Sequence, residues 1–195
     1  MSLAVPNSYR VTAPDASSCL RQGEILTHLG QFRPDIASLG TDSTAGRLFW
    51  HPFAVILTQD CDLEQDFHVR SAGKESDKLL PGILFCEVAT AEEVHGRTRQ
   101  INAKLWDGIK INNNVRFHFL QKVEPGCDRL HEGLPELSID FKRYFTLPAE
   151  EVYKRIDLGE AQRRCVLVSP YMEHLCVRFA SYLSRIALPA DHSSE

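Results

Sequence analysis

The sequence places acidic residues at alternate positions around one cysteine. Residues 58–66 read Thr-Gln-Asp-Cys-Asp-Leu-Glu-Gln-Asp and follow an apolar run directly. If that strand continued, the four carboxylates would share one face, because side chains alternate along a strand. Such a face favours a hard divalent cation, Mg²⁺ or Ca²⁺, with Asp60, Asp62 and Glu64 as candidate metal ligands. The alternatives are arginine or lysine partners from another element, or a solvated acidic edge.

Cys61 is the candidate nucleophile of this acidic patch. A reactive thiol needs a low pKa and therefore positive neighbours, whereas Asp60 and Asp62 favour the protonated thiol. A histidine that folding brings near, such as His51 or His118, would compensate for them. The alternative is that Cys61 is a small buried residue at the end of a core strand.

A group of basic residues lies toward the end of the chain. His174, Arg178 and Arg185 share one side of a predicted helix, and Arg163 and Arg164 precede that helix. Such a basic face would meet RNA or DNA phosphates. It would equally pair with the acidic patch of this protein or of a partner protein, or form the solvated side of a surface helix. These five residues are the candidate residues for binding a nucleic acid or a partner.

The composition is that of a globular protein. The chain has 195 residues, 43 % hydrophobic and 25 % charged, which excludes disorder, collagen and coiled coil as the main class. Its 22 basic and 26 acidic residues give a net charge of -4, so a strongly basic global field is absent. There is no glycine-rich phosphate loop and no Gly-x-Ser-x-Gly motif, which disfavours nucleotide hydrolysis and serine hydrolase chemistry.

The cysteines and the apolar runs bear on the compartment. A chain this long can build a core without disulfides, so we expect the six cysteines to be reduced. The first ten residues lack the layout of a signal peptide, and no apolar stretch approaches the length of a membrane span. We therefore expect a cytoplasmic protein that does not insert into a membrane.

Apolar patterns predict the elements that must position these residues. Strands are expected at 23–29, 47–59, 79–89, 115–120 and 137–147, separated by a loop at 30–46 and a polar connection or exposed ribbon at 60–78. The continuous apolar run at 53–57 suits a strand that is covered on both faces. Helices are expected within 90–110 and from Pro148 onward. The clearest helix follows Ser169 and Pro170, with an apolar stripe that includes Leu175, Phe179 and Leu183.

Residues 23–58 resemble the MazF/PemK-like toxins. In that family an early strand opens with Gly-Asp/Glu-apolar, and here the residues are Gly23-Glu24-Ile25. An Arg-Pro step then leads into an apolar strand that ends in Ser or Thr; here His51-Pro52 leads to Thr58. The resemblance implies an SH3-like barrel, an endoribonuclease activity and a link to toxin–antitoxin or defence systems. Histidine stands where the family has an arginine that helps to cleave RNA, and it can act there as an acid or base.

Together these patterns predict one α+β domain over residues 19–189. We expect a strongly bent antiparallel sheet or an SH3-like barrel over 20–147, with C-terminal helices at 148–188 packed on it. Residues 1–18 are expected to be a flexible segment and 190–195 a tail. The segment from Leu57 to Leu63 also resembles a string found in bacterial proteins that have no assigned function, so we expect a bacterial origin.

Two classes of function follow, and a third depends on the acidic patch. The absence of a compact catalytic constellation favours a non-enzymatic binding or regulatory module, with a protein or a nucleic acid as its partner. The alternative is a MazF/PemK-like endoribonuclease or nucleic-acid-binding protein, with His51, Thr58 and Cys61 as candidate catalytic residues. The third is a carboxylate metal-binding protein that holds a divalent cation at Asp60, Asp62 and Glu64.

Overall fold

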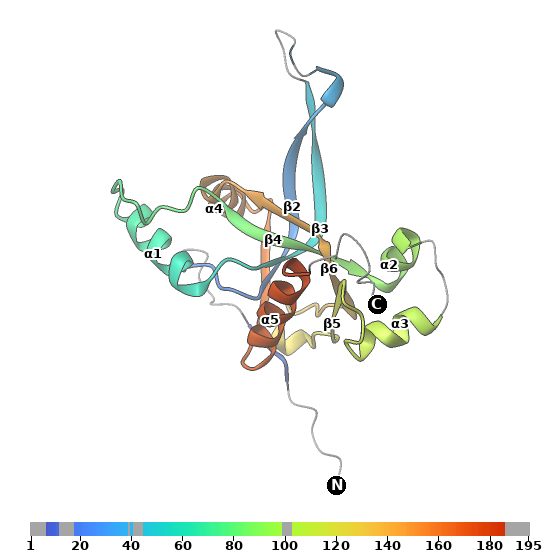
Figure 1. Ribbon diagram of the computed structural model, residues 1–195. Coiled ribbons are helices and arrows are strands. Elements are labelled where there is room, and N and C mark those ends of the chain that lie inside the picture. Colours follow the sequence, from blue (N-terminus) through green and yellow to red (C-terminus); the bar gives the residue numbers. More distant parts are fainter. Residues whose placement is uncertain (1–6, 12–17, 39, 41–44, 99–102, 186–195) are drawn as a thin grey trace, which may run out of the picture.

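The computed structural model describes residues 7–11, 18–38, 40, 45–98 and 103–185, and the expected α+β class is confirmed (Figure 1). Seven strands form one antiparallel sheet in the order β1-β7-β2-β3-β4-β6-β5. The strands are β1 (Tyr9–Val11), β2 (Glu24–Pro34), β3 (Gly46–Ile56), β4 (Ile83–Thr90), β5 (Phe117–Leu120), β6 (Leu137–Leu147) and β7 (Gln162–Leu167). The helices are α1 (Asp60–Ser71), α2 (Ala91–Thr98), α3 (Ala103–Lys110), α4 (Ala149–Asp157) and α5 (Tyr171–Leu183).

The sheet is open. Its two edge strands, β1 and β5, lie at opposite ends of the strand order, and no pairing among the described residues joins them. Of the two expected arrangements, the antiparallel sheet is therefore present and the closed SH3-like barrel is not confirmed. Within the described residues, no helix combines the length and the apolar character that crossing a membrane requires.

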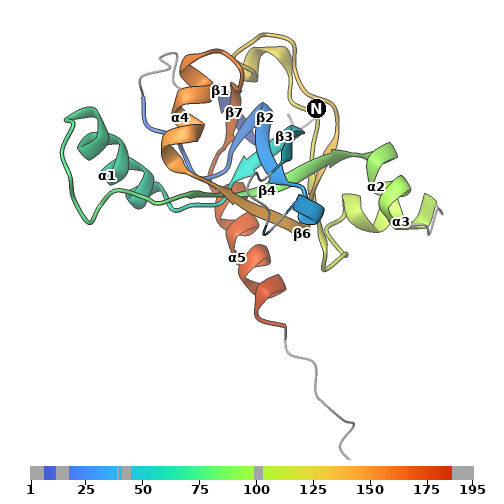
Figure 2. The same cartoon turned by 90° about the horizontal axis from the view of Figure 1, so that it is seen from above.

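Both faces of the sheet centre are covered, as the apolar run at 53–57 predicts. Val55 packs into a core with Leu175 and Phe179 of α5, whereas Ala54 and Ile56 face a second core that α4 and α1 complete. Figure 2 shows α5 and α4 on opposite sides of the sheet. The expected docking of the last helix is confirmed for Leu175 and Phe179, but Leu183 is 52 % exposed and lies outside the core.

Several expected elements differ from the structure. Residues 60–71 form helix α1 rather than a ribbon, and β7 lies within residues 148–188, which were expected to be helical. Residues 9–11, expected within a flexible segment, form edge strand β1, and Tyr9 is buried. The apolar residues of β1 and β7 complete one core, because Tyr9, Cys165 and Leu167 pack together with α5.

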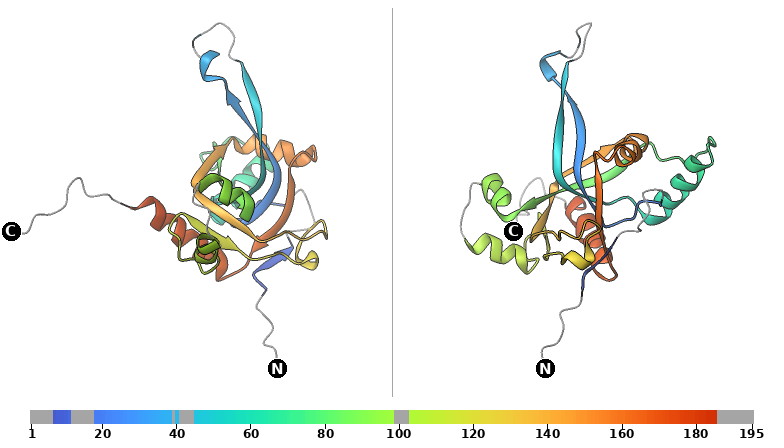
Figure 3. Two further views of the ribbon diagram at one scale, coloured as in Figure 1. Left: turned by 90° about the vertical axis from the view of Figure 1, so that its right-hand side faces the viewer. Right: turned by 180° about the vertical axis from the view of Figure 1, so that it is seen from behind.

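The most conspicuous feature is a two-stranded arm formed by β2 and β3. These strands pair from Ile25↔Val55 to Pro34↔Gly46, whereas β7 follows β2 only as far as Thr27 and β4 follows β3 only from Phe53 onward. Residues 29–34 of β2 and 46–51 of β3 therefore extend beyond the sheet, and we call them the arm (Figures 1 and 3). The loop expected at 30–46 is wrong for residues 30–34, which are strand.

Candidate functional site

The acidic patch is a helix start rather than a carboxylate face. Asp60 opens α1, where a negative charge is favourable at the helix N-terminus. Its carboxylate accepts two hydrogen bonds from Arg21, at 3.0 and 2.7 Å, and one from the Gln22 backbone N–H at 2.7 Å. Partial burial opposes ionisation of Asp60, but Arg21 and the Gln22 amide outweigh it and lower the pKa of this carboxyl. Asp60 therefore joins α1 to the turn before β2.

The other acidic residues of the patch do not converge. Asp62 and Glu64 are exposed on α1, and Glu64 lies 3.8 Å from His68 one turn along the helix. Asp66 points into the protein and pairs with Arg70 at 2.8 Å. The expectation that these carboxylates share one strand face is wrong, because the segment is helical. The described residues contain no group of three histidine, cysteine or carboxylate side chains placed to hold a metal ion.

The structure does not bring the three candidate catalytic residues together. Cys61 is exposed on the first turn of α1, beside Gln59 and Asp62. The Thr58 hydroxyl accepts a hydrogen bond from the Leu84 backbone N–H at 2.8 Å and so fixes the end of β3 to β4. His51 lies seven residues earlier, which at roughly 3.3 Å per residue along an extended chain is about 20 Å away.

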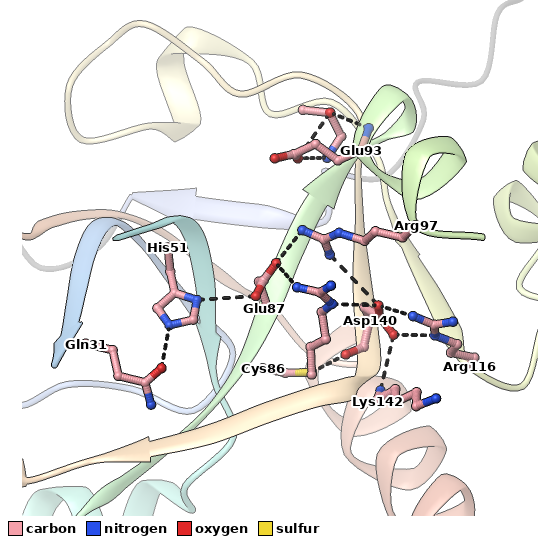
Figure 4. A network of polar contacts seen from close by, with 11 residues as sticks. Gln31, His51, Cys86, Glu87, Glu93, Arg97, Arg116, Asp140 and Lys142 are labelled. Carbon is pink, nitrogen blue, oxygen red and sulfur yellow. Dashed lines mark hydrogen bonds and ion pairs between the residues drawn. The ribbon is translucent and has the colours of Figure 1, made fainter. Parts of the chain in front are cut away.

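His51 is instead part of a buried polar network at the base of the arm (Figure 4). The side chain is 1 % exposed, and its ring stacks on Phe145 of β6 with centroids 3.9 Å apart. Its Nδ1 lies 3.4 Å from the Glu87 carboxylate of β4, and its Nε2 lies 3.2 Å from the Gln31 side-chain oxygen of β2. One histidine thus links the two strands of the arm to two strands of the sheet.

Three arginines surround the two buried carboxylates of the network. Glu87 contacts Arg97 of α2 and Arg143 of β6, the latter at 3.4 Å. Asp140 of β6 accepts two hydrogen bonds from Arg116, at 2.7 and 2.6 Å. Burial opposes ionisation of Glu87, but His51, Arg97 and Arg143 outweigh it and lower the pKa of this carboxyl.

The network positions the arm. Buried charges are tolerated when they are paired and hydrogen-bonded, and removing one partner is costly. Its members come from β2, β3, β4, β6 and α2, so they fix the base of the arm to the body (Figure 4). His51 and Glu87 are 1 % and 3 % exposed, so a substrate would reach them only if the surrounding side chains moved.

Two of the five candidate basic residues are structural. Arg163 is 2 % exposed and binds the Glu24 carboxylate together with the Cys19 carbonyl. Arg164 is 5 % exposed and binds both oxygens of Asp128, at 2.8 and 2.6 Å. The prediction that these two arginines lie on a nucleic-acid-binding face is wrong, because both point into the protein from opposite faces of β7.

The remaining three basic residues also lack a common surface. Arg178 is half-buried and donates hydrogen bonds to the carbonyls of Asn112, Asn114 and Phe117, at 2.5, 2.6 and 2.9 Å. His174 and Arg185 are exposed. Of these three residues only His174, in the first turn of α5, and Arg185, two residues after the end of α5, are exposed, so they form no stripe.

The arm carries an exposed apolar face that the sequence did not indicate. Residues that pair directly across two strands point to the same side, and the pairs here are Phe32↔Leu48 and Gly30↔Trp50. Phe32, Leu48 and Trp50 are 57 %, 39 % and 46 % exposed, and we call them the apolar face of the arm. The opposite, basic face carries Arg33 and Arg47, which are also paired across the arm.

Two glycines let the aromatic rings lie flat on the arm. A side chain at Gly46 would collide with the Phe32 ring, and a Cβ at Gly30 would lie 3.1 Å from the Trp50 ring. The Phe32 ring therefore leans from β2 across β3, and the Trp50 ring leans from β3 across β2. The two rings thus cover the backbone of the arm, and the Arg155 guanidinium lies beside the Trp50 ring at Gly30.

Comparison with known proteins identifies no relative of this chain. The chain matches no model of a protein family and none of the curated proteins with which it was compared. The resemblance to MazF/PemK-like toxins therefore depends on residues 23–58 alone.

Proposed function

We propose that this protein is a non-enzymatic binding module that recognises a protein partner through the apolar face of the arm. The observation that carries the proposal is the exposure of Phe32, Leu48 and Trp50 on one face of a projecting ribbon. Contiguous apolar patches on a protein surface mark interaction sites. Tryptophan and phenylalanine are typical anchors of protein interfaces.

The energetics of the arm support a covered state. A two-stranded ribbon alone is marginally stable in water and needs a further strand or a packed face. Fully burying a large apolar side chain contributes about 1.5–3 kcal/mol, and the three side chains of the apolar face are roughly half exposed. A partner that covered them would therefore add about 1 kcal/mol for each side chain, before the costs of association.

The fixed base of the arm supports the same proposal. Binding costs less when the recognition surface is already ordered, because fewer side chains and segments lose freedom. The network around His51 and Glu87 fixes the base of the arm to the sheet, and Gly30 and Gly46 make room for the two aromatic rings on the arm.

A nucleic-acid partner is the alternative, and it would use the opposite face. That face carries Arg33, whose guanidinium carbon lies 3.6 Å from the centre of the Phe49 ring, and Arg47. A protein partner fits the arm better. Two arginines give a weak electrostatic contact, whereas phosphate-backbone binding depends on many basic side chains.

Affinity capture with matched variants tests the proposal. The immobilised wild type, a Phe32→Ser/Leu48→Ser/Trp50→Ser triple variant and a Val177→Ser/Leu183→Ser control are each exposed to lysate of the producing cells. Val177 and Leu183 are exposed on α5, at 64 % and 52 %, so the control removes apolar surface elsewhere. We expect one protein to be retained by the wild type and the control and lost from the triple variant.

Three results would contradict the proposal. One is equal retention of every protein by all three forms. Another is recovery of nucleic acid that depends on Arg33 and Arg47 instead of on the apolar face. The third is cleavage of RNA by the wild type that is lost in a folded His51→Ala variant, which would establish the endoribonuclease alternative.

A further inference from the structure

Neither edge of the arm has a strand beside it among the described residues, and the β2 edge is the one toward which the Trp50 ring lies across Gly30. Among the described residues, β7 pairs with β2 through Thr27, and no strand pairs with the outer side of residues 29–34. Leu29 and Gly30 are buried, with the Arg155 guanidinium of α4 beside Gly30, so this edge is open at residues 31–33. The outward backbone N–H and C=O groups of these residues are available to another chain, and an open edge of this kind accepts an added strand. Pro34 has no N–H and ends the usable edge.

A hollow opens where β7 leaves this edge. It has a volume of about 480 Å³ and is lined by His28, Trp50, Gly159, Glu160 and Gln162. Trp50 belongs to β3, but its ring crosses Gly30 toward the β2 edge, so it contributes to the apolar face and to the hollow. An apolar side chain of an added strand would contact this ring as an anchor.

The basic face of the arm would contact the other set of side chains on an added strand. Arg33 and Arg47 are paired directly across the two strands, and like charges in that position are destabilising. Neither arginine forms an ion pair with any described residue, although Arg33 donates a hydrogen bond to the Gln31 side chain at 3.0 Å. An acidic side chain on an added strand would relieve this repulsion.

We infer that the partner binds as an extended segment that adds a β-strand to the outer edge of β2, with alternating apolar and acidic residues. Successive side chains of a strand point to opposite faces, so one set would meet the apolar face and the other the basic face. The inference rests on the proposed function and specifies the partner as a linear acidic, amphipathic peptide segment.

A library of random linear dodecapeptides displayed on phage is the probe. It is selected on the full-length protein after counter-selection on the Phe32→Ser/Leu48→Ser/Trp50→Ser variant. We expect the enriched peptides to alternate apolar and acidic residues over at least five positions. Peptides without this alternation, or no enrichment, would overturn the inference.

Two measurements on a synthesised peptide test strand addition itself. In a Trp106→Phe background, binding should shift the Trp50 emission to the blue and slow amide exchange within residues 31–33, the open part of the edge. Alternate N–H groups of the bound peptide would point toward and away from β2. N-methylation of the set that points toward β2 should abolish binding, and N-methylation of the other set should leave binding intact. Equal binding by both N-methylated sets would contradict a backbone ladder.

Charge exchange tests the acidic half of the peptide. We expect the Arg33→Glu/Arg47→Glu variant to bind the acidic peptide about tenfold more weakly than the wild type does. A peptide whose acidic residues are replaced by lysine should bind this variant with the lost affinity restored. Both positions are exposed, so the loss of the Arg33 contacts with Phe49 and Gln31 should lower the melting temperature by only about 2–4 °C. Unchanged affinity of the acidic peptide for the charge-reversed protein would contradict this part of the inference.

Failure of the inference is distinguishable from failure of the proposed function. If lysate capture yields a protein that needs the apolar face, but no alternating peptide is selected and residues 31–33 gain no protection, the binding module stands and strand addition is wrong. Sedimentation that shows self-association lost in the triple variant would identify a second copy as the occupant and overturn the inference.

Discussion

Replacing Glu87 with glutamine tests whether the network fixes the arm to the body. The substitution keeps the shape of the side chain and removes the charge that faces His51, Arg97 and Arg143. Removing one partner of a buried ion pair costs about 3–5 kcal/mol. Arg143 is 43 % exposed and regains solvent, and the amide keeps an acceptor, so we expect a loss of about 2 kcal/mol.

The stability difference between the wild type and Glu87→Gln should depend on pH. The folded protein lowers the pKa of Glu87 below its usual value of 4.5. Its contribution is therefore fully present above that value and is lost as the pH falls through the lower pKa of the folded state. The difference between wild type and Glu87→Gln should be largest at pH 7 and should shrink by about pH 3.5.

Urea unfolding at pH 7 and at about pH 3.5 measures this difference in stability. At pH 7 the melting temperature of Glu87→Gln should lie about 4–8 °C below that of the wild type. Glu64→Gln is the control, because Glu64 is exposed and its only described ion-pair contact is with His68 at 3.8 Å. A Glu87→Gln cost no larger than that of the control would refute the account of the network. A cost that is the same at both pH values would refute the assignment of the ionised carboxylate.

Two further predictions concern α5 and the thiols. Leu175→Asp should cost at least about 4 kcal/mol in urea unfolding, because it places a charge in the core, whereas Val177→Asp, at an exposed position, should stay within about 0.5 kcal/mol; similar costs would mean that α5 docks differently. In the folded protein a thiol reagent should modify exposed Cys61 rapidly, but Cys86 and Cys165 only after unfolding, because burial raises the pKa of both thiols. Mass spectrometry of labelled peptides would show the order, and early labelling of Cys86 would contradict the core.

Local sequence patterns correctly predicted the strand and the helix that pack into the apolar cores. The run at 53–57 and the stripe through Leu175 and Phe179 identify a buried strand and a docked helix, because burial of continuous or helically spaced apolar residues determines both. Helix α1 was missed although the signal was present. Asp60 and Asp62 lie in its first turn, where acidic residues are favourable, and the alternation of charges suggested a strand instead.

The candidate site could not be predicted, because its residues are brought together only by the fold. Gly30 and Pro34 suggested a loop, since both are common in turns, yet here Gly30 makes room for an aromatic ring. The network joins residues of five elements without a local spacing. The one available signal was a charged residue inside an apolar strand, as at Glu87 and Asp140, which predicts a buried partner.

The position of β7 imposes an order on folding. β7 lies between β1 and β2, although most of the chain separates it from them in sequence. Glu24 of β2 is buried, and among the described residues its ion pair is with Arg163, 139 residues later. During synthesis the earlier strands must wait with an open edge and an uncompensated carboxylate, and such long-range pairing makes folding slow and exposes the chain to aggregation. The Glu24–Arg163 ion pair can therefore form only after β7 has been synthesised.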